Sequence, residues 1–290
     1  MMTAYFQSQR LPRIASDAAL SGLLPERAHW VPMPGGRTNH IWRVESDQAP
    51  LVVKLYIKQA GTPLFPNDDR AEYAVLQHLA GSGLAPHPVA HVATAAGPCV
   101  IYRHVPGSHS SSDPAGIGAV LRHLHRIAPP AGLRHVASGS AAILRKGDEI
   151  LAQCEDDAGL RAFRPKLAVG ATADPVFLHG DPVPANILAT AQGSCLIDWQ
   201  CPAVGDRCED LAICLSPAMR FLYGGQPLGR ENENRFLQAY GDPATVARYR
   251  ALAPAFHWRM AAYCQWRAQR REPDNSHAKE LELSALRALA

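Results

Sequence analysis

The chain has 290 residues, 47% of them hydrophobic, and a formal net charge of +3. It can therefore bury a substantial core, as one large domain or as two lobes. It contains no long run of lysines and arginines, which argues against a nucleic-acid-binding surface, and no apolar stretch near the ~20 residues of a membrane span.

The N-terminus and the cysteines indicate the cellular compartment. The opening sequence MMTAYFQSQRLPRIAS has no apolar core of the kind that signal peptides carry. The seven cysteines form no CxxC pair and are odd in number, which is typical of reduced thiols. We therefore expect a cytoplasmic protein without an obligatory protein partner. A zinc site formed by Cys201, Cys208 and Cys214 is disfavoured by their spacing.

The first third of the chain is rich in predicted strands. Residues 1–30 predict helix with loops. Segments 40–46 (HIWRVES) and 49–57 (APLVVKLYI) are short, alternating and β-branched, which predicts paired strands. Segment 91–107 predicts a hairpin that turns at Gly97-Pro98.

A helix is predicted between these strands, over residues 66–83. Asn67 or Asp68 can cap it, and Gly81 or Gly83 ends it. Its apolar residues recur on one face: Ala71, Val75, Leu76 and Leu79.

The remainder, from the helical pattern at 111–127 onward, is mostly helical. The exception is 176–198, where short apolar runs flank turns. We place the boundary near Pro106-Gly107, between an N-terminal lobe (1–106) that binds nucleotide and a helical lobe (107–290).

Three polar residues follow short apolar runs in the helical part. VFLHGDPVPANIL (176–188) supplies Asp181 and Asn186, and CLID (195–198) ends in Asp198. An aspartate beside a substrate hydroxyl can accept its proton, while Asn and Asp oxygens suit Mg²⁺ with phosphate oxygens completing its shell. Phosphoryl transfer needs this set together with a cation on the phosphates.

The predicted strands supply the cation. Lys54 stands inside the apolar strand LVVKLY, where its charge needs a partner, and Glu72 on the following helix is the candidate. Lys58 is a weaker alternative. Upstream, the backbone amides of Gly35 and Gly36 could approach phosphates closely.

These motifs resemble the aminoglycoside phosphotransferase/choline kinase family. The family pattern HGDxxxxN, then [IV]D[FW], then GDxxxDLA is present as Asp181 with Asn186, as Ile197-Asp198-Trp199, and over 205–212. The resemblance covers roughly residues 25 to 270. It implies an α+β, two-lobed, protein-kinase-like fold with a small antiparallel β-sheet lobe and a larger helical lobe, and the use of ATP and Mg²⁺.

The resemblance also implies roles for individual residues. Asp181 would be the catalytic base, Asn186 and Asp198 would bind Mg²⁺, and Lys54 with Glu72 would anchor the phosphates. The nucleotide contacts would include the glycine-rich segment and the hinge between the lobes: Gly35, Gly36, Thr38 and Asn39, then Tyr102, His104 and Val105.

Three further polar residues of these motifs predict structural roles. We interpret His179 as shaping the loop through backbone hydrogen bonds. Asp206 and Asp210 are expected to bind backbone amides and to brace the catalytic loop.

The acceptor is specified less well than the nucleotide. Segment 216–271 holds nine arginines but only Glu231, Glu233 and Asp242 as acids, which argues against a polycationic aminoglycoside. Aromatic faces there can bind one alkylammonium group, or can be core packing. The aromatic candidates are Phe256, Trp258, Tyr263 and Trp266, with Trp199 from the [IV]D[FW] segment.

The leading hypothesis is an ATP-dependent small-molecule kinase. GGRTNHIWRV resembles the GGxTNxxxxV of the choline, ethanolamine and thiamine kinase branch, so the acceptor would be such an alcohol. The alternatives are an aminoglycoside or other sugar O-phosphotransferase, an acceptor with its own carboxylate or phosphate, and a non-catalytic nucleotide-binding regulator.

Overall fold

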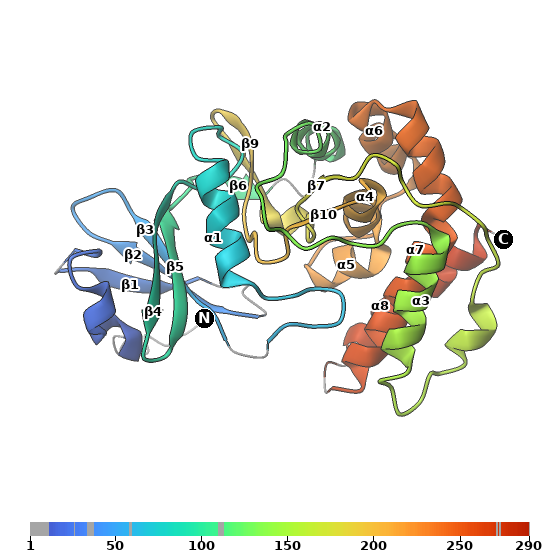
Figure 1. The fold of residues 1–290 in the computed structure, drawn as a ribbon, viewed down its shortest axis with the longest axis horizontal. Helices are drawn as coiled ribbons and strands as arrows, with labels where there is room; N and C mark the ends of the chain where they lie inside the picture. Colours follow the sequence, from blue (N-terminus) through green and yellow to red (C-terminus); the bar gives the residue numbers. More distant parts are fainter. Residues whose placement is uncertain are drawn as a thin grey trace, which may run out of the picture.

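Two lobes make up the described part of the chain (Figure 1), with strands at one end and most of the helices at the other. The structure, a computed structural model, describes residues 12–25, 27–33, 38–57, 60–109, 113–270, 272 and 274–289. No helix in these ranges combines the length and the apolar character that a membrane crossing requires.

A five-stranded antiparallel sheet forms the smaller lobe, in the order β1-β2-β3-β5-β4. The strands are β1 (His29–Pro32), β2 (His40–Glu45), β3 (Leu51–Leu55), β4 (Pro88–Thr94) and β5 (Gly97–Arg103). The predicted strand pair and hairpin are confirmed, but the hairpin turns at residues 95–96, because Gly97 already pairs with Thr94.

The segment before the sheet differs from the helical expectation. It contains two short 3₁₀ helices, η1 (Arg13–Ser16) and η2 (Ala18–Leu20), but then enters the sheet as β1. The expectation of helix with loops is therefore wrong for the end of this segment.

Both faces of the sheet are buried. Val53 and Leu55 of β3 pack in a cluster with Ile14 and Leu20 of the 3₁₀ helices. Since side chains alternate along a strand, Val52 points to the opposite face, into the core that includes helix α1. Lys54 shares the parity of Val52, so it too is directed towards α1.

Helix α1 (Asp69–His78) confirms the predicted helix and its cap. The Asp68 carboxylate accepts hydrogen bonds from the backbone amides of residues 70 and 71, which have no partner inside the helix. After the helix, Gly81 and Gly83 have φ values of +81° and +77°, a conformation that glycine adopts without strain.

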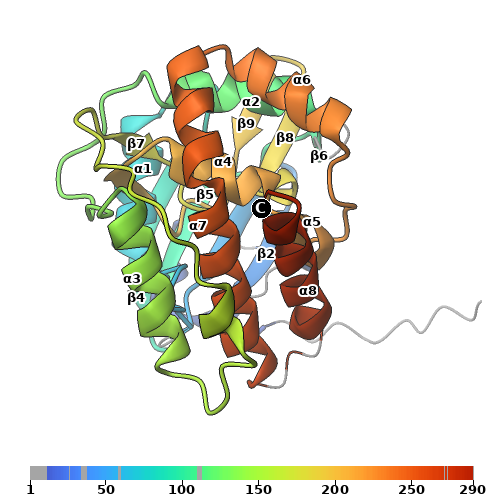
Figure 2. The same ribbon diagram turned by 90° about the vertical axis from the view of Figure 1, so that its right-hand side faces the viewer.

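The larger lobe is built around the long helix α7 (Pro243–Ala268), which packs between α3 (Ser140–Leu151) and α8 (Asp274–Arg287) (Figure 2). The remaining helices are α2 (Pro114–Leu124), η3 (Leu160–Phe163), η4 (Pro184–Asn186), α4 (Cys208–Leu215), α5 (Pro217–Leu222) and α6 (Arg230–Tyr240).

Short strands in this lobe position the loops between them. β7 (Val176–Leu178) pairs with β10 (Ala203–Gly205), and β8 (Ile187–Thr190) pairs with both β6 (Ser108–His109) and β9 (Gly193–Leu196). The predicted lobe boundary near Pro106-Gly107 stays a prediction. It falls between the end of β5 and β6.

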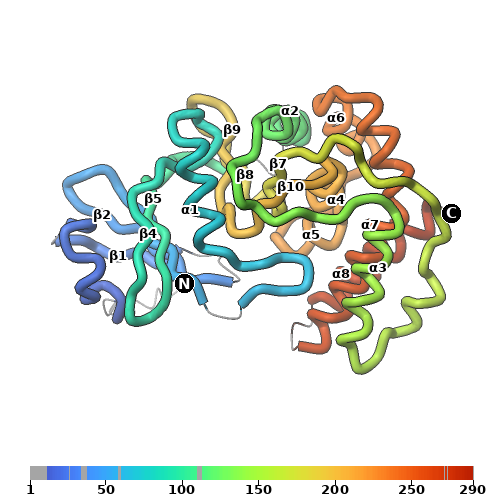
Figure 3. Tube along the Cα trace, viewed as in Figure 1, coloured from blue at the N-terminus to red at the C-terminus, as the bar shows by residue number. Residues whose placement is uncertain are grey.

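The segment between β3 and α1 runs out from the sheet towards the helical lobe (Figure 3). The ring of Phe65 packs edge-on against Tyr263 of α7, with centroids 5.2 Å apart. The Cys201 thiol donates a hydrogen bond to the carbonyl of Pro66. This segment, residues 60–67, is called the strap below.

Candidate active site

The predicted catalytic loop, called the catalytic loop below, begins where β7 ends, at His179-Gly180-Asp181. Gly180 has φ +83°, and a β-carbon there would lie 2.0 Å from the Cys201 carbonyl oxygen. The close approach of the two backbones therefore requires glycine at this position.

Asp210 of α4 holds this loop from below. Its two carboxylate oxygens accept hydrogen bonds from the backbone amides of His179 (2.8 Å) and Gly180 (2.9 Å). The bracing role predicted for Asp210 is confirmed. Asp206 accepts from the backbone amide of Cys208 and from Arg248, so it too binds a backbone amide, but one outside the catalytic loop.

His179 is a structural residue, as predicted. The Asp181 amide donates to His179 Nδ1, so Nε2 carries the proton and donates to the carbonyl of Ile197 at 3.0 Å. Burial lowers the pKa of His179, which favours this neutral form.

Asp181 is buried but has an unsatisfied oxygen. Its side chain is 4% exposed, and Oδ1 has no hydrogen-bond partner among the described residues. Burial raises the pKa of Asp181 well above its ordinary value, and the nearby carboxylates of Asp198 and Asp210 raise it further. A buried acceptor without a partner is costly, so this oxygen is available to a ligand proton.

Asp181 lines a narrow pocket of about 40 Å³, called the Asp181 pocket. Its wall combines side chains from both lobes. The other lining residues are Thr38, Thr62, Phe65, Gln200, Met219, Leu222, Tyr223, Tyr263, Arg267, Glu272 and Asn275.

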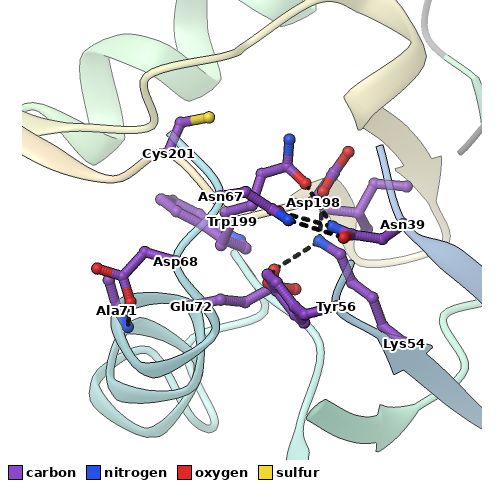
Figure 4. A network of polar contacts seen from close by, with 12 residues as sticks. Asn39, Lys54, Tyr56, Asn67, Asp68, Ala71, Glu72, Asp198, Trp199 and Cys201 are labelled. Atoms are coloured by element: carbon purple, nitrogen blue, oxygen red, sulfur yellow. Dashed lines mark hydrogen bonds and ion pairs between the residues drawn. The ribbon is translucent and has the colours of Figure 1, made fainter. Parts of the chain in front are cut away.

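Lys54 contacts one carboxylate in each lobe (Figure 4). Its Nζ lies 2.6 Å from Glu72 Oε2 and 2.5 Å from Asp198 Oδ1. Lys54 and Glu72 are each 1% exposed, and the Tyr56 hydroxyl also donates to Glu72. Burial alone would lower the pKa of Lys54, but Asp198 and Glu72 outweigh it and raise that pKa, so the lysine is charged.

Asn186 and Asp198 retain oxygens that can hold a metal. Asn186 donates its amide to the Asp181 carbonyl at 2.9 Å, which leaves its Oδ1 as an acceptor. Asp198 uses Oδ1 for Lys54 and adopts φ +63°, a strained value for a residue other than glycine. Two oxygens on neighbouring loops fit Mg²⁺ completed by phosphate and water. No group of three or more His, Cys, Asp or Glu side chains in the described part of the chain is arranged to hold a metal ion.

The glycine-rich segment is described from Thr38 onward, so Gly35 and Gly36 lie outside the described residues. Thr38 lines the Asp181 pocket. Asn39 forms a reciprocal amide pair with Asn67 of the strap (2.8 and 2.9 Å) and donates to Gln200 at 2.8 Å. Asn39 therefore ties β2, the strap and the segment after Asp198 together.

The predicted hinge residues connect the two lobes. Tyr102 is buried in β5, and His104 donates its backbone amide to the carbonyl of Pro50 at 2.9 Å. His104 and Val105 are half-buried. Their adenine contact stays a prediction.

The aromatic candidates divide into two groups. Trp258 is fully buried, and its Nε1 donates to the carbonyl of Leu160. Its six-membered ring faces Gly147 of α3. Trp199 is also fully buried and stacks on Phe177. The expectation that Trp258 and Trp199 bind the acceptor is therefore wrong, because both rings belong to the core.

The other two aromatic residues lie at or near the pocket. Tyr263 lines the Asp181 pocket. Trp266 stacks on Tyr263 with centroids 6.1 Å apart, and the guanidinium of Arg270 covers Trp266 at 3.9 Å. Phe256, a further candidate, is buried in the core. No sequence pattern pointed to Tyr223, which caps the C-terminal end of α5, or to Glu272, which precedes α8; both line the pocket.

Comparison with known proteins identifies the family of the chain. The model of the phosphotransferase enzyme family (APH) matches residues 29–253. The chain belongs to this family. Among proteins with curated descriptions, none matches the sequence.

Solved structures of several kinases and phosphotransferases share the fold. A choline/ethanolamine kinase family protein from Mesorhizobium loti superposes with a TM-score of 0.65 at 16% identity, over 95% of this chain and 92% of that one. Choline kinase LicA from Streptococcus pneumoniae superposes with a TM-score of 0.64 at 17% sequence identity, over 93% of this chain and 96% of that one. Spectinomycin phosphotransferase APH(9)-Ia superposes with a TM-score of 0.53 at 14% sequence identity, over 89% of this chain and 88% of that one. The predicted two-lobed, protein-kinase-like fold is confirmed.

Proposed function

We propose that the protein is an ATP- and Mg²⁺-dependent kinase that transfers the γ-phosphate to the hydroxyl of a small alcohol. The observation that carries this proposal is the contact of Lys54 with Glu72 in its own lobe and with Asp198 in the helical lobe. The residue before Asp198, Ile197, donates its backbone amide to the Asn186 carbonyl at 2.9 Å, and the charges of Asp198 and Lys54 both act on the carboxyl group of Asp181. Phosphoryl transfer requires this combination of groups.

The reaction uses each group once. Lys54 orients the phosphates and offsets their charge, and Glu72 fixes the lysine. As the acceptor oxygen bonds to the γ-phosphorus, its proton passes to the carboxylate of Asp181. The bond from the γ-phosphorus to the bridging oxygen breaks, and its electron pair leaves with ADP. Asn186 and Asp198 would hold the Mg²⁺, which neutralises phosphate charge when bound.

The Asp181 pocket supports a small acceptor. It is narrow, and beside Asp181 it carries one other carboxylate, Glu272, which Arg267 binds at 2.9 and 2.6 Å. An aminoglycoside has several ammonium groups, so a site that binds it needs several carboxylates. Tyr223 and Tyr263 instead line the pocket with aromatic rings, and aromatic rings bind a single alkylammonium group. Choline, ethanolamine or a thiamine-like alcohol is therefore the proposed acceptor class.

The test is ADP release with Mg²⁺ and ATP over a panel of hydroxylated metabolites that includes these alcohols, neutral sugars and aminoglycosides. We expect turnover with an alkylammonium alcohol. Turnover with a sugar or an aminoglycoside alone would keep the kinase and reject the acceptor. Failure of ATP or GTP with Mg²⁺ to raise the melting temperature would reject the kinase.

The role of Asp181 has its own test. Asp181→Asn should keep nucleotide affinity, because the base acts on the acceptor hydroxyl, while turnover collapses by about 10²–10⁴-fold. Asp174→Asn is the matched control, since Asp174 is exposed and pairs with Arg207. Asp181→Asn with most of its activity would show that another group takes the proton.

A further inference from the structure

A second cavity lies against the catalytic loop and is larger than the Asp181 pocket. Its volume is about 270 Å³, and it is enclosed by α3, α4, α7, the strap and the segment before α3. We call it the basic cleft. Its lining residues are Pro63, Leu64, Phe65, Arg134, His135, Val136, Ala137, Ala142, Arg145, Lys146, Glu149, Leu178, Gly180, Ala203, Glu209, Ile213, Arg259 and Met260.

The charges in the basic cleft do not cancel. Glu209 binds Arg259 through two hydrogen bonds of 3.0 and 2.6 Å, and Glu149 lies 3.3 Å from Lys146. These two pairs use both acids of the lining.

Two arginines of the lining are left without a carboxylate partner there. Arg134 donates to the backbone carbonyl of Cys201, an uncharged group, and Arg145 lies on α3. Neither makes an ion pair with a residue that the structure describes, and both are exposed towards solvent. The cleft therefore carries an excess of two positive charges at its rim.

The interior of the basic cleft is apolar. Leu178 and Ala203 come from the paired strands β7 and β10, and Ile213 and Met260 come from the helices behind them. An occupant is thus offered both guanidinium groups and hydrocarbon by the lining of the cleft.

The basic cleft is separate from the reaction centre. It contacts the catalytic loop at Gly180, whereas Asp181 lines the other pocket. Phe65 lines both cavities and so forms a shared wall. Lys54, Asn186 and Asp198 do not line the cleft.

We propose that the basic cleft binds a small organic anion, a carboxylate or phosphate ester with a short apolar body, at a site of its own. Arg134 and Arg145 bind the anionic group by charge-assisted hydrogen bonds, and the apolar interior covers the body of the ligand. This inference goes beyond the proposed function and does not rest on it, because binding requires neither nucleotide nor turnover.

The test is calorimetric titration of the whole protein with three probes: succinate, glycerol 3-phosphate and inorganic phosphate. We expect millimolar or tighter binding of an organic probe and weaker binding of inorganic phosphate, which lacks the apolar body. The preference between the first two probes distinguishes a carboxylate ligand from a phosphate ester. Binding should persist in saturating ATP and Mg²⁺.

Variants locate the site. Arg134→Gln with Arg145→Gln should weaken binding about tenfold. Ala142→Leu should weaken it by filling the cleft while leaving the charge unchanged. Arg126→Gln is the control, since this exposed arginine lies outside the cleft.

Four results would overturn the proposal. They are no heat from any of the probes at millimolar concentration, competition by ATP, an equal loss in the Arg126→Gln control, and full affinity in Ala142→Leu. Failure of the ADP-release assay would leave these measurements unaffected, so the two proposals fail separately.

Discussion

Replacing Lys54 by methionine should destabilise the protein strongly. The lysine is 1% exposed and lies within 2.6 Å of one carboxylate and 2.5 Å of another. Methionine keeps much of the apolar stem but leaves Glu72 and Asp198 without the cation between them. Removing one partner of a buried ion pair costs about 3–5 kcal/mol. For a chain of this length that corresponds to a fall in melting temperature of roughly 5–8 °C.

The loss should depend on pH. Burial and the charge of Asp198 raise the pKa of Glu72 while Lys54 opposes them, so without the lysine Glu72 binds a proton in the folded state. A folded-state pKa above the unfolded value gives stability that is present at low pH and is lost as the pH rises through the raised value. The variant should therefore be closest to wild type in acid and furthest from it in base.

Urea titrations at several pH values measure the effect. The double variant Lys54→Met/Glu72→Gln should recover more than about 1 kcal/mol, because it removes the uncompensated charge. The control is Lys146→Met, since Lys146 and Glu149 are 40% and 53% exposed, and it should cost less than about 1 kcal/mol. The reasoning is refuted if Lys54→Met unfolds like this control, or if its loss is the same at every pH.

Three further changes test other parts of the structure. Asp210→Asn leaves one backbone amide of the catalytic loop facing an NH₂ group, so it should cost about 1.5–3 kcal/mol and lower kcat more than it raises the KM for ATP; unchanged kinetics would show that the loop holds its shape alone. Gly180→Ala puts a β-carbon 2.0 Å from the Cys201 carbonyl oxygen at φ +83° and should cost about 2–4 kcal/mol by urea titration; a wild-type midpoint would contradict this. Burial lowers the pKa of His257, but Glu282 outweighs burial and raises that pKa above 6.5. The stability that the His257–Glu282 pair contributes should therefore be complete below pH 6.5 and lost as the pH rises through the raised pKa. His257→Gln should remove this slope from the pH dependence of the free energy of unfolding.

The local sequence pattern predicted the strand, the helix and the loop that carry Lys54, Glu72 and the Asp181–Asn186 pair. Alternation along β3 and a charge in an apolar strand predicted that Lys54 needs a partner, and the helix that follows supplied Glu72 at the right face. The spacing of Asp181 and Asn186 needed no tertiary knowledge, because one loop carries both.

Side-chain pairing between distant segments could not be predicted. The amides of Asn39, Asn67 and Gln200 meet although 28 and 161 residues separate Asn39 from its partners. Trp258 failed as an acceptor residue for a related reason. α7 contacts α3, α4 and α8 on different sides, so helical spacing alone does not say which aromatic ring points into the core.

The strap has a consequence for how the two lobes move. It leaves the sheet lobe, yet Phe65 rests on Tyr263 and the residue after it accepts a hydrogen bond from Cys201. A change in the angle between the lobes therefore displaces one wall of the Asp181 pocket. Any ligand that favours one angle by binding between the lobes must alter the affinity of that pocket, and an occupant of the pocket must alter the affinity of the first ligand by the same factor. The affinities of two ligands would then be coupled through the lobe angle, by a segment that has no chemical role in the reaction.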